Sequence, residues 1–311
     1  MGKTAFIFPG QGAQHAGMGK DFYDQSNTAR EVFQCATDVT GLDIPKLVFT
    51  ENDELDKTEY TQIAMITAEL AIWKTMLERG FKADICAGLS LGEYAAIAAA
   101  GVMDIEDIFR IVRKRGIYMQ NAYPEGGAMT AVLGLDNATV DNICRSVSEG
   151  SGLVVSVANY NCPGQIVITG VKEAVTQAAD ECIKAGAKRC IALNVSGPFH
   201  SALLSDAADK LAEELKKAEV KTPKLPYYTN VTAEAVTDAA DVHALLAAQI
   251  CSGVRWQQSV ERMIADGAEV FLEIGPGKTL AGFMKRINKE VKVYNIGTVE
   301  EMENAAAAMG L

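Results

Sequence analysis

The stretch that decides the fold is Gly88-Leu89-Ser90-Leu91-Gly92. An apolar run, residues 83–87, comes before it, and an alanine-rich run, residues 93–100, follows it. A strand, the pattern Gly-x-Ser-x-Gly and a helix, in this order, predict a nucleophile elbow, a turn so tight that glycine is needed two residues before and two residues after the serine. Five residues can match the pattern by chance, and the flanking strand and helix are what favour a catalytic Ser90. Its hydroxyl would stand clear of the sheet at a helix N-terminus, whose free N–H groups favour negative charge.

The composition is typical of a soluble globular enzyme. The chain has 311 residues, 49% of them hydrophobic and 22% charged, and its net charge of −11 argues against general binding to nucleic acid or anionic membranes. No apolar run approaches the length of a membrane span. Seven cysteines with irregular spacing, no Cys-x-x-Cys and no signal peptide predict reduced thiols in a cytoplasmic protein. We expect Cys162, in a polar loop, to be the cysteine open to solvent.

Strands and helices alternate along most of the chain, which predicts a mostly parallel sheet covered on both faces. Residues 126–196 have another order, β-α-β-β-α-β, which is that of a ferredoxin-like unit. The predicted fold is therefore α/β: an α/β-hydrolase-like, mostly parallel sheet domain of residues 1–125 and 197–311, with an inserted ferredoxin-like (βαββαβ) subdomain of residues 126–196. We expect residues 159–164 to be a loop, residues 225–229 a strand and residues 201–220 one helix.

A serine nucleophile needs a base within hydrogen-bond reach, and the chain has three histidines. His15 lies in a glycine-rich loop, and His243 lies in a late helix among apolar neighbours. His200 is the best candidate, because a Gly-Pro turn fixes the backbone just before it at a loop-to-helix junction. An α/β-hydrolase would add an acidic residue between the serine and the histidine. None of the many acidic residues there stands in an informative pattern, so the third member stays open.

The first predicted strand, residues 4–8, ends in Pro9-Gly10-Gln11-Gly12. Ligands of open α/β sheets collect at the carboxyl ends of strands, so this loop is expected near the site. It lacks the Lys-Ser/Thr ending of a phosphate loop and does not complete Gly-x-Gly-x-x-Gly, so nucleotide binding is not expected.

Several stretches, taken together and in order, match one family from end to end. They are residues 8–12, residues 88–94, Arg115 with Met119-Gln120, residues 159–165, residues 197–201, Gln249 and residues 273–277. With the inserted β-α-β-β-α-β unit, they make the chain resemble the malonyl-CoA:acyl-carrier-protein transacylases of bacterial type II fatty-acid synthesis. One departure is Leu89, where many family members have histidine. That position is not expected to supply the base, so we expect the change to affect packing.

The resemblance implies a ping-pong acyl transfer through a malonyl ester on Ser90. His200 would be the base and then the acid, oriented by a backbone carbonyl and a glutamine that Gln249 matches. The backbone N–H groups of Gln11 and Leu91 would form the oxyanion hole. The partners implied are malonyl-CoA, as a substrate, and an acyl carrier protein, with no cofactor, no metal, no nucleic acid and no membrane. We expect a monomer.

Three further positions have implied roles on the substrate. Arg115 would bind the free carboxylate of the malonyl group, since a planar guanidinium can take a carboxylate through two parallel hydrogen bonds. The spacing of charges on its predicted helix does not by itself single out this arginine. Asn159 and Asn161 would lie beside the pantetheine arm.

Other functions fit parts of the same pattern. A serine esterase or thioesterase would use the same elbow but would leave Arg115 without a role. A related acyltransferase would supply a polyketide pathway, with malonyl or another extender unit, although Phe199 before His200 resembles the malonyl-using pattern. A non-catalytic module that binds carrier proteins would not need the Ser90 hydroxyl.

Overall fold

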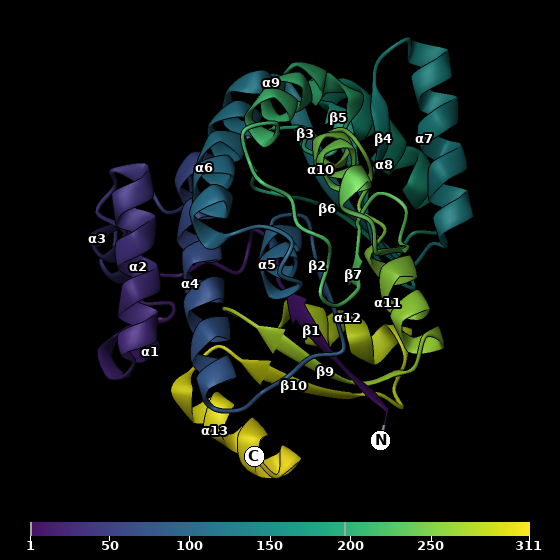
Figure 1. Ribbon diagram of the computed structural model, residues 1–311. Coiled ribbons are helices and arrows are strands. Elements are labelled where there is room, and N and C mark those ends of the chain that lie inside the picture. Colours follow the sequence, from purple (N-terminus) through teal and green to yellow (C-terminus); the bar gives the residue numbers. More distant parts are fainter. Residues whose placement is uncertain (1, 196) are drawn as a thin grey trace.

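The computed structural model describes residues 2–195 and 197–311, and it contains two separate sheets (Figure 1). The larger sheet has the strand order β10-β9-β1-β2-β7-β8, in which all neighbours are parallel except the last pair. Its strands are β1 (Lys3–Phe8), β2 (Ile85–Gly88), β7 (Tyr227–Tyr228), β8 (Ala235–Val236), β9 (Ala268–Ile274) and β10 (Lys292–Ile296).

Helices pack on both faces of this sheet, as the alternation of elements predicts. The central strand β1 shows why, because its side chains point to opposite faces in turn. Phe6 and Phe8 pack into one core cluster with helices such as α4 and α5, whereas Ala5 and Ile7 pack into another with α11 and α12. The helices are α1 (Lys20–Gln25), α2 (Asn27–Thr40), α3 (Ile44–Phe49), α4 (Thr58–Glu78), α5 (Gly92–Ala99), α6 (Ile105–Ala122), α9 (Ser205–Leu215), α10 (Val242–Gln249), α11 (Trp256–Ala265), α12 (Thr279–Ile287) and α13 (Val299–Met309).

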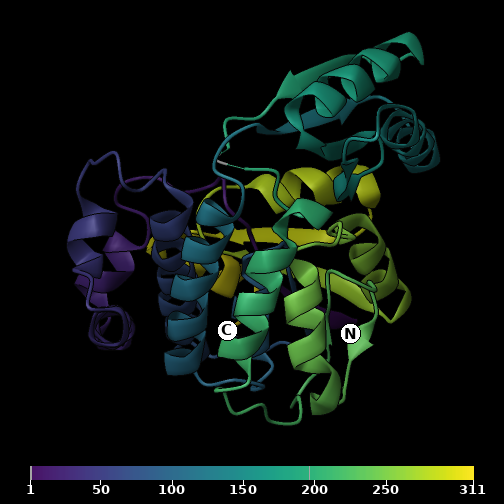
Figure 2. The same cartoon turned by 90° about the horizontal axis from the view of Figure 1, so that it is seen from above.

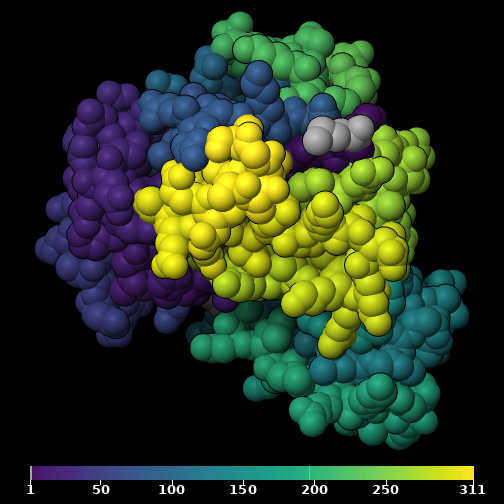
Figure 3. Space-filling model, turned by 90° about the horizontal axis from the view of Figure 1, so that it is seen from below, coloured from purple at the N-terminus to yellow at the C-terminus, as the bar shows by residue number. Residues whose placement is uncertain are grey.

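The second sheet is antiparallel and has the order β4-β5-β3-β6. Two helices pack on it, and Figure 2 shows this unit to one side of the larger body. In the space-filling view it projects beside the C-terminal part of the chain (Figure 3). The chain order β-α-β-β-α-β is the one expected from the sequence. Its elements are β3 (Gly127–Leu133), α7 (Asn137–Ser151), β4 (Val155–Cys162), β5 (Gln165–Val171), α8 (Lys172–Lys184) and β6 (Arg189–Ala192).

The predicted ends of the two units at residues 1 and 196 lie outside the described residues. Between residues 2 and 195 and from 197 onward, no helix is both long and apolar enough to cross a bilayer.

Three local predictions are wrong. Asn159–Cys162 belongs to strand β4, where it pairs with β5, so only Pro163 and Gly164 form the turn, and Cys162 is buried. The helix expected over residues 201–220 is a short 3₁₀ turn, Ala202–Leu204, followed by α9, which ends at Leu215. The strand expected over residues 225–229 has two residues. The bounds of the two strands follow their pairing partners, which are β5 for β4 and both β2 and β8 for β7.

Candidate active site

The turn after β2 places Ser90 at the carboxyl end of the parallel sheet. Ser90 has a positive φ of 53°, a conformation that non-glycine residues rarely adopt. A Cβ on Gly88 would lie 1.9 Å from the carbonyl carbon of Gly92, and a Cβ on Gly92 would lie 2.2 Å from the carbonyl oxygen of Phe8. Only glycine fits at these two positions, which is the steric demand of a nucleophile elbow.

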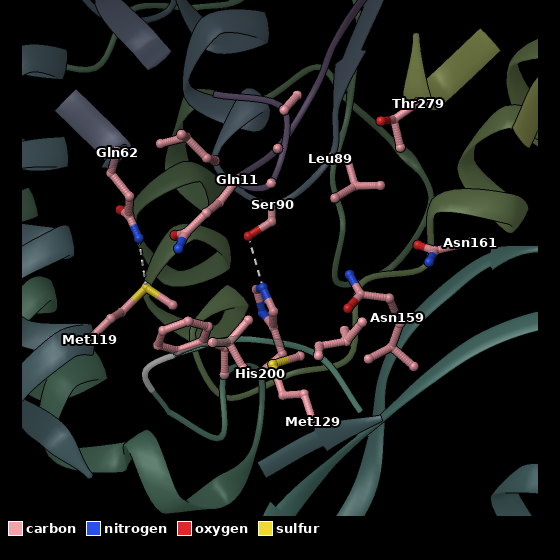
Figure 4. A pocket seen from close by; sticks show the side chains of 18 of the residues that line it. Gln11, Gln62, Leu89, Ser90, Met119, Met129, Asn159, Asn161, His200 and Thr279 are labelled. Atoms are coloured by element: carbon pink, nitrogen blue, oxygen red, sulfur yellow. Dashed lines mark hydrogen bonds between the residues drawn. The ribbon is translucent and has the colours of Figure 1, made fainter. Parts of the chain in front are cut away.

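His200 lies directly against this serine, although 110 residues separate them in the sequence. Its Nε2 is 2.8 Å from the Ser90 Oγ (Figure 4). Its Nδ1 is 2.8 Å from the backbone carbonyl oxygen of Gln249. A carbonyl oxygen can only accept, so Nδ1 carries the hydrogen and the lone pair of a neutral ring lies on Nε2. The Ser90 hydroxyl therefore donates to the nitrogen that would remove its proton.

Gln249 acts on the histidine through its backbone, and its side chain makes other contacts. The Oε1 atom accepts a 2.9 Å hydrogen bond from Arg115 Nη2, and Nε2 donates to the carbonyl oxygen of Ser90 and to Glu93. The expected pair of a carbonyl and a glutamine side chain on the ring is thus one residue, whose carbonyl alone contacts His200. Among the described residues, no carboxylate hydrogen-bonds to this ring, in contrast to an acidic triad.

Arg115 comes from α6 and is fully buried beside the serine. Its Nη2 lies 3.2 Å from Ser90 Oγ, its Nη1 donates to Gln62 Oε1 at 2.8 Å, and its guanidinium stacks on the Tyr94 ring at 5.4 Å from the centroid. The Nε atom has no hydrogen-bond partner among the described residues. A buried cation with spare donors next to a nucleophile favours an anionic group on the substrate.

Two backbone N–H groups near Ser90 are free to hold an oxyanion. Leu91 is the N-cap residue of α5, and Gln11 follows Pro9-Gly10 after β1. Neither backbone N–H donates a hydrogen bond to any atom of the described residues, and both residues line the same cavity. The side chain of Gln11 donates to Thr58, so it is held away from its own N–H.

The cavity has a volume of about 240 Å³ and lies between the two sheets. Ser90 and His200 meet on one side of it, with Gln11 nearby, whereas Asn159 and Asn161 reach it from β4 (Figure 4). It has a polar end at the serine and a mainly apolar wall. The wall includes Leu89, Met119, Met129, Val167, Leu193, Phe199 and Phe283.

All eight residues singled out from the sequence are near this site: seven line the cavity, and Gln249 lies directly behind it. His15 and His243, the two discounted histidines, do not line it.

Sequence reasoning missed the buried polar groups that hold the site together. Asn230 accepts from the Ser90 backbone N–H at 2.6 Å and donates to the Gly88 carbonyl at 2.7 Å, so one side chain closes the elbow. Glu93, one helical turn after the serine, binds both Asn230 and Gln249. Its place on the elbow helix could have suggested this role, whereas Asn230, 140 residues from Ser90, has no local signal.

Burial sets the protonation of the site. It lowers the pKa of His200 to about 4, with the positive charge of Arg115 as the second cause, so the ring is neutral at pH 7. Burial raises the pKa of the Glu93 carboxyl to about 7, against the hydrogen bonds that favour the carboxylate. Burial also lowers the pKa of Arg115, which remains charged because guanidinium starts from a very high value.

Comparison with known proteins identifies the family of this chain over nearly its whole length. The family model described as an acyl transferase domain matches residues 5–308. The chain belongs to the acyl transferase family.

This acyl transferase is similar to named relatives over nearly its full length. It is 42% identical over 307 residues to the malonyl CoA-acyl carrier protein transacylase of Bacillus subtilis, which covers 98% of this chain and 96% of the relative. It is 43% identical to the protein of the same name from Escherichia coli K12, with both chains covered completely. A malonyl-transacylase solved in complex with a type II PKS acyl-carrier protein superposes with a TM-score of 0.94 at 41% identity, covering 98% and 99% of the two chains.

Proposed function

We propose that this acyl transferase moves the malonyl group from malonyl-CoA to the phosphopantetheine thiol of an acyl carrier protein, and so supplies fatty-acid elongation. The observation that carries the proposal is the buried Arg115 guanidinium, 3.2 Å from a serine hydroxyl that donates to a neutral histidine. This pairing suits an acyl group with a free carboxylate. The names of relatives more than 40% identical over the full chain support the same substrate and carrier.

In the first half-reaction, Ser90 Oγ attacks the thioester carbonyl carbon while His200 Nε2 takes the hydroxyl proton. The charge that develops on the carbonyl oxygen is held by the N–H groups of Gln11 and Leu91, which have no other acceptor in the described structure. One such donor lowers the activation free energy of acyl transfer by on the order of 3 kcal/mol. The carbon–sulfur bond then breaks, and His200 gives its proton to the CoA thiolate, leaving a malonyl ester on Ser90.

The second half-reaction runs the same steps with a new thiol. The phosphopantetheine thiol of the carrier gives its proton to His200 and attacks the ester carbonyl. The bond to Ser90 Oγ breaks, and the serine oxygen takes the proton back. The carbonyl of Gln249 keeps the ring orientation throughout, since it accepts from Nδ1–H in both protonation states. All of these groups belong to the chain, so we propose no cofactor.

The remaining roles concern the shape of the site and the state of the protein. We propose that Asn159 and Asn161 contact the pantetheine arm, because both amides border the cavity between the sheets. We also propose that residues 126–196 form an inserted subdomain of a larger unit, residues 1–125 and 197–311. The separate antiparallel sheet supports this division. Seven free cysteines agree with a cytoplasmic protein, and we propose a monomer, which light scattering would test.

The proposal is tested by incubating the enzyme with radiolabelled malonyl-CoA. We expect an acid-stable label that Ser90→Ala abolishes and that holo acyl carrier protein removes into its own thioester. Label on a cysteine would overturn the proposal. Rapid release of free malonate without a carrier, at the rate of transfer, would favour a serine esterase.

A second candidate is supply of a polyketide carrier by the same chemistry. It is favoured by the similarity to the malonyl-transacylase solved with a type II PKS acyl-carrier protein. Comparing kcat/KM for carriers of the two pathways, and for malonyl- and methylmalonyl-CoA, decides between the two, since specificity is a difference in transition-state binding.

A further inference from the structure

Glu93 is a fully buried carboxylate that contacts none of the reacting groups directly. It lies on α5, three residues after the serine, and its Oε2 atom accepts from two directions. Gln249 Nε2 donates to it at 2.6 Å, and the backbone N–H of Asn230 donates to it at 3.2 Å. The other oxygen, Oε1, has no hydrogen-bond partner among residues 2–195 and 197–311.

The first of these contacts leads to the arginine and the histidine. Gln249 Nε2 is held by Glu93 and by the Ser90 carbonyl, which turns Oε1 of the same amide toward Arg115 Nη2 at 2.9 Å. An amide has one oxygen and one nitrogen end, so fixing the nitrogen end fixes what the oxygen end can accept. The backbone of Gln249 meets His200 Nδ1, so the residue that Glu93 holds contacts both groups.

The second contact leads to the nucleophile. Asn230 bonds the backbone on both sides of the strained elbow, at the Gly88 carbonyl and the Ser90 N–H. The positive φ of Ser90 costs energy on its own and persists only when its surroundings fix it. Glu93 holds the backbone of Asn230 and thereby the side chain that closes the turn.

We propose that Glu93 is a positioning residue for acyl transfer, whose Oε2 atom holds Gln249 and Asn230 in place. Through these two residues it fixes the positions of Arg115, His200 and Ser90 relative to one another. The inference rests on the proposed malonyl transfer and adds a residue to it. The position of Oε2 carries the role, because Oε2 keeps its bonds to Gln249 and Asn230 when Oε1, which makes neither of them, holds a proton. The Thr229 side chain is a further neighbour that favours the carboxylate. Burial, which raises the pKa of this carboxyl to about 7, fits a group that works in either state.

Two substitutions separate position from charge. Glu93→Gln keeps an oxygen at the same distance from the backbone and removes the charge. Glu93→Asp keeps the charge and withdraws the carboxylate by one carbon, about 1.5 Å. The matched control is Glu69, another fully buried glutamate, in α4 and outside the cavity lining, whose carboxylate has no hydrogen-bond partner in the described part of the chain. Glu69→Asp removes the same buried carbon without touching the site.

The readout is kcat/KM for malonyl-CoA and for acetyl-CoA with holo carrier, together with the thermal midpoint of each variant. In Glu93→Asp we expect malonyl transfer to fall roughly 100-fold, the size of a 1 Å misplacement, and acetyl transfer roughly tenfold, so that the malonyl-to-acetyl ratio falls about tenfold. Glu93→Gln should keep the ratio within about threefold of wild type. Glu69→Asp should leave the ratio unchanged even where it lowers the thermal midpoint.

Four outcomes would decide against the inference or its basis. A Glu93→Asp enzyme with the wild-type ratio overturns the positioning role. A Glu93→Gln enzyme that loses the ratio as Glu93→Asp does overturns the claim that the position of the oxygen carries the role without its charge. An equal fall for both acyl groups in Glu93→Asp, matched by Glu69→Asp, assigns the residue to stability alone. If the wild-type enzyme does not load the carrier at all, the proposed function fails, and that result is read before any variant is compared.

Discussion

Replacing Arg115 by alanine should change which acyl group the enzyme transfers, and by a large factor. The guanidinium is fully buried, and it bonds Gln62, Gln249 and the Ser90 hydroxyl. A malonyl group on Ser90 brings its free carboxylate into this enclosed region. Without the arginine, no lysine or arginine of the described residues lines the cavity to meet that carboxylate, whereas an acetyl group brings no charge.

The size of the effect follows from the burial of the pair. Leaving a buried charge without its partner costs about 3–5 kcal/mol. At 1.36 kcal/mol for each factor of ten, malonyl transfer should fall roughly 150- to 5000-fold in kcat/KM. Acetyl transfer feels the loosening of the Gln62 and Gln249 side chains and the loss of the contact to Ser90 Oγ, which we expect to cost about tenfold or less.

The assay measures kcat/KM for malonyl- and acetyl-CoA in parallel, with Arg113→Ala as the control. Arg113 lies on the same helix and pairs with Glu59, and it is not part of the cavity lining. Its loss should leave the malonyl-to-acetyl ratio unchanged. Arg115→Lys should recover only part of the malonyl activity, since an ammonium cannot present two parallel N–H groups.

An equal fall for both acyl groups in Arg115→Ala would refute this reasoning. It would mean that the arginine stabilises the folded site through Gln62 and Gln249 and does not select the substrate.

Three other measurements test the energetics of the site. The kcat/KM for acylation should hold down to about pH 5 and fall only near pH 4, because burial and the Arg115 charge lower the pKa of His200 to about 4; an acid limb near 6.5 would contradict this. The folded chain holds the Glu93 proton more tightly than the unfolded chain, since burial raises that pKa from 4.5 to about 7, so stability should fall as pH rises through this window, by roughly 3 kcal/mol. Urea unfolding at pH 5 and pH 8 should show that Glu93→Gln removes this loss, and an unchanged pH dependence would argue against it. Gly88→Ala should give no stable fold, because its Cβ would overlap Gly92, whereas Gly282→Ala in α12, with open space around it, should be neutral or more stable by up to about 1 kcal/mol; circular dichroism and thermal melts compare the two.

The sequence by itself determined the elements whose cause is local. Short apolar runs located the parallel strands of the larger sheet, and the βαββαβ order was visible in the succession of predicted strands and helices. The glycines around Ser90 could be understood in advance, since a turn that brings Gly88 against Gly92 leaves no room for a Cβ. The family resemblance added the other site residues in their order along the chain, but it did not show which of their atoms are in contact.

Only the tertiary structure decided what depends on partners far away in the sequence. Asn159–Cys162 is strand and not loop because β5 pairs with it, and Asn159 forms a further bridge to Val254. The family resemblance implied that a backbone carbonyl orients His200, but only the fold shows that this carbonyl belongs to Gln249 itself. The contacts of Glu93 and Asn230 join segments about 140 residues apart, and their effect comes from burial, which removes water as the competing partner. Local sequence can propose a nucleophile, but the exclusion of water that makes its neighbours act together exists only once the chain is folded.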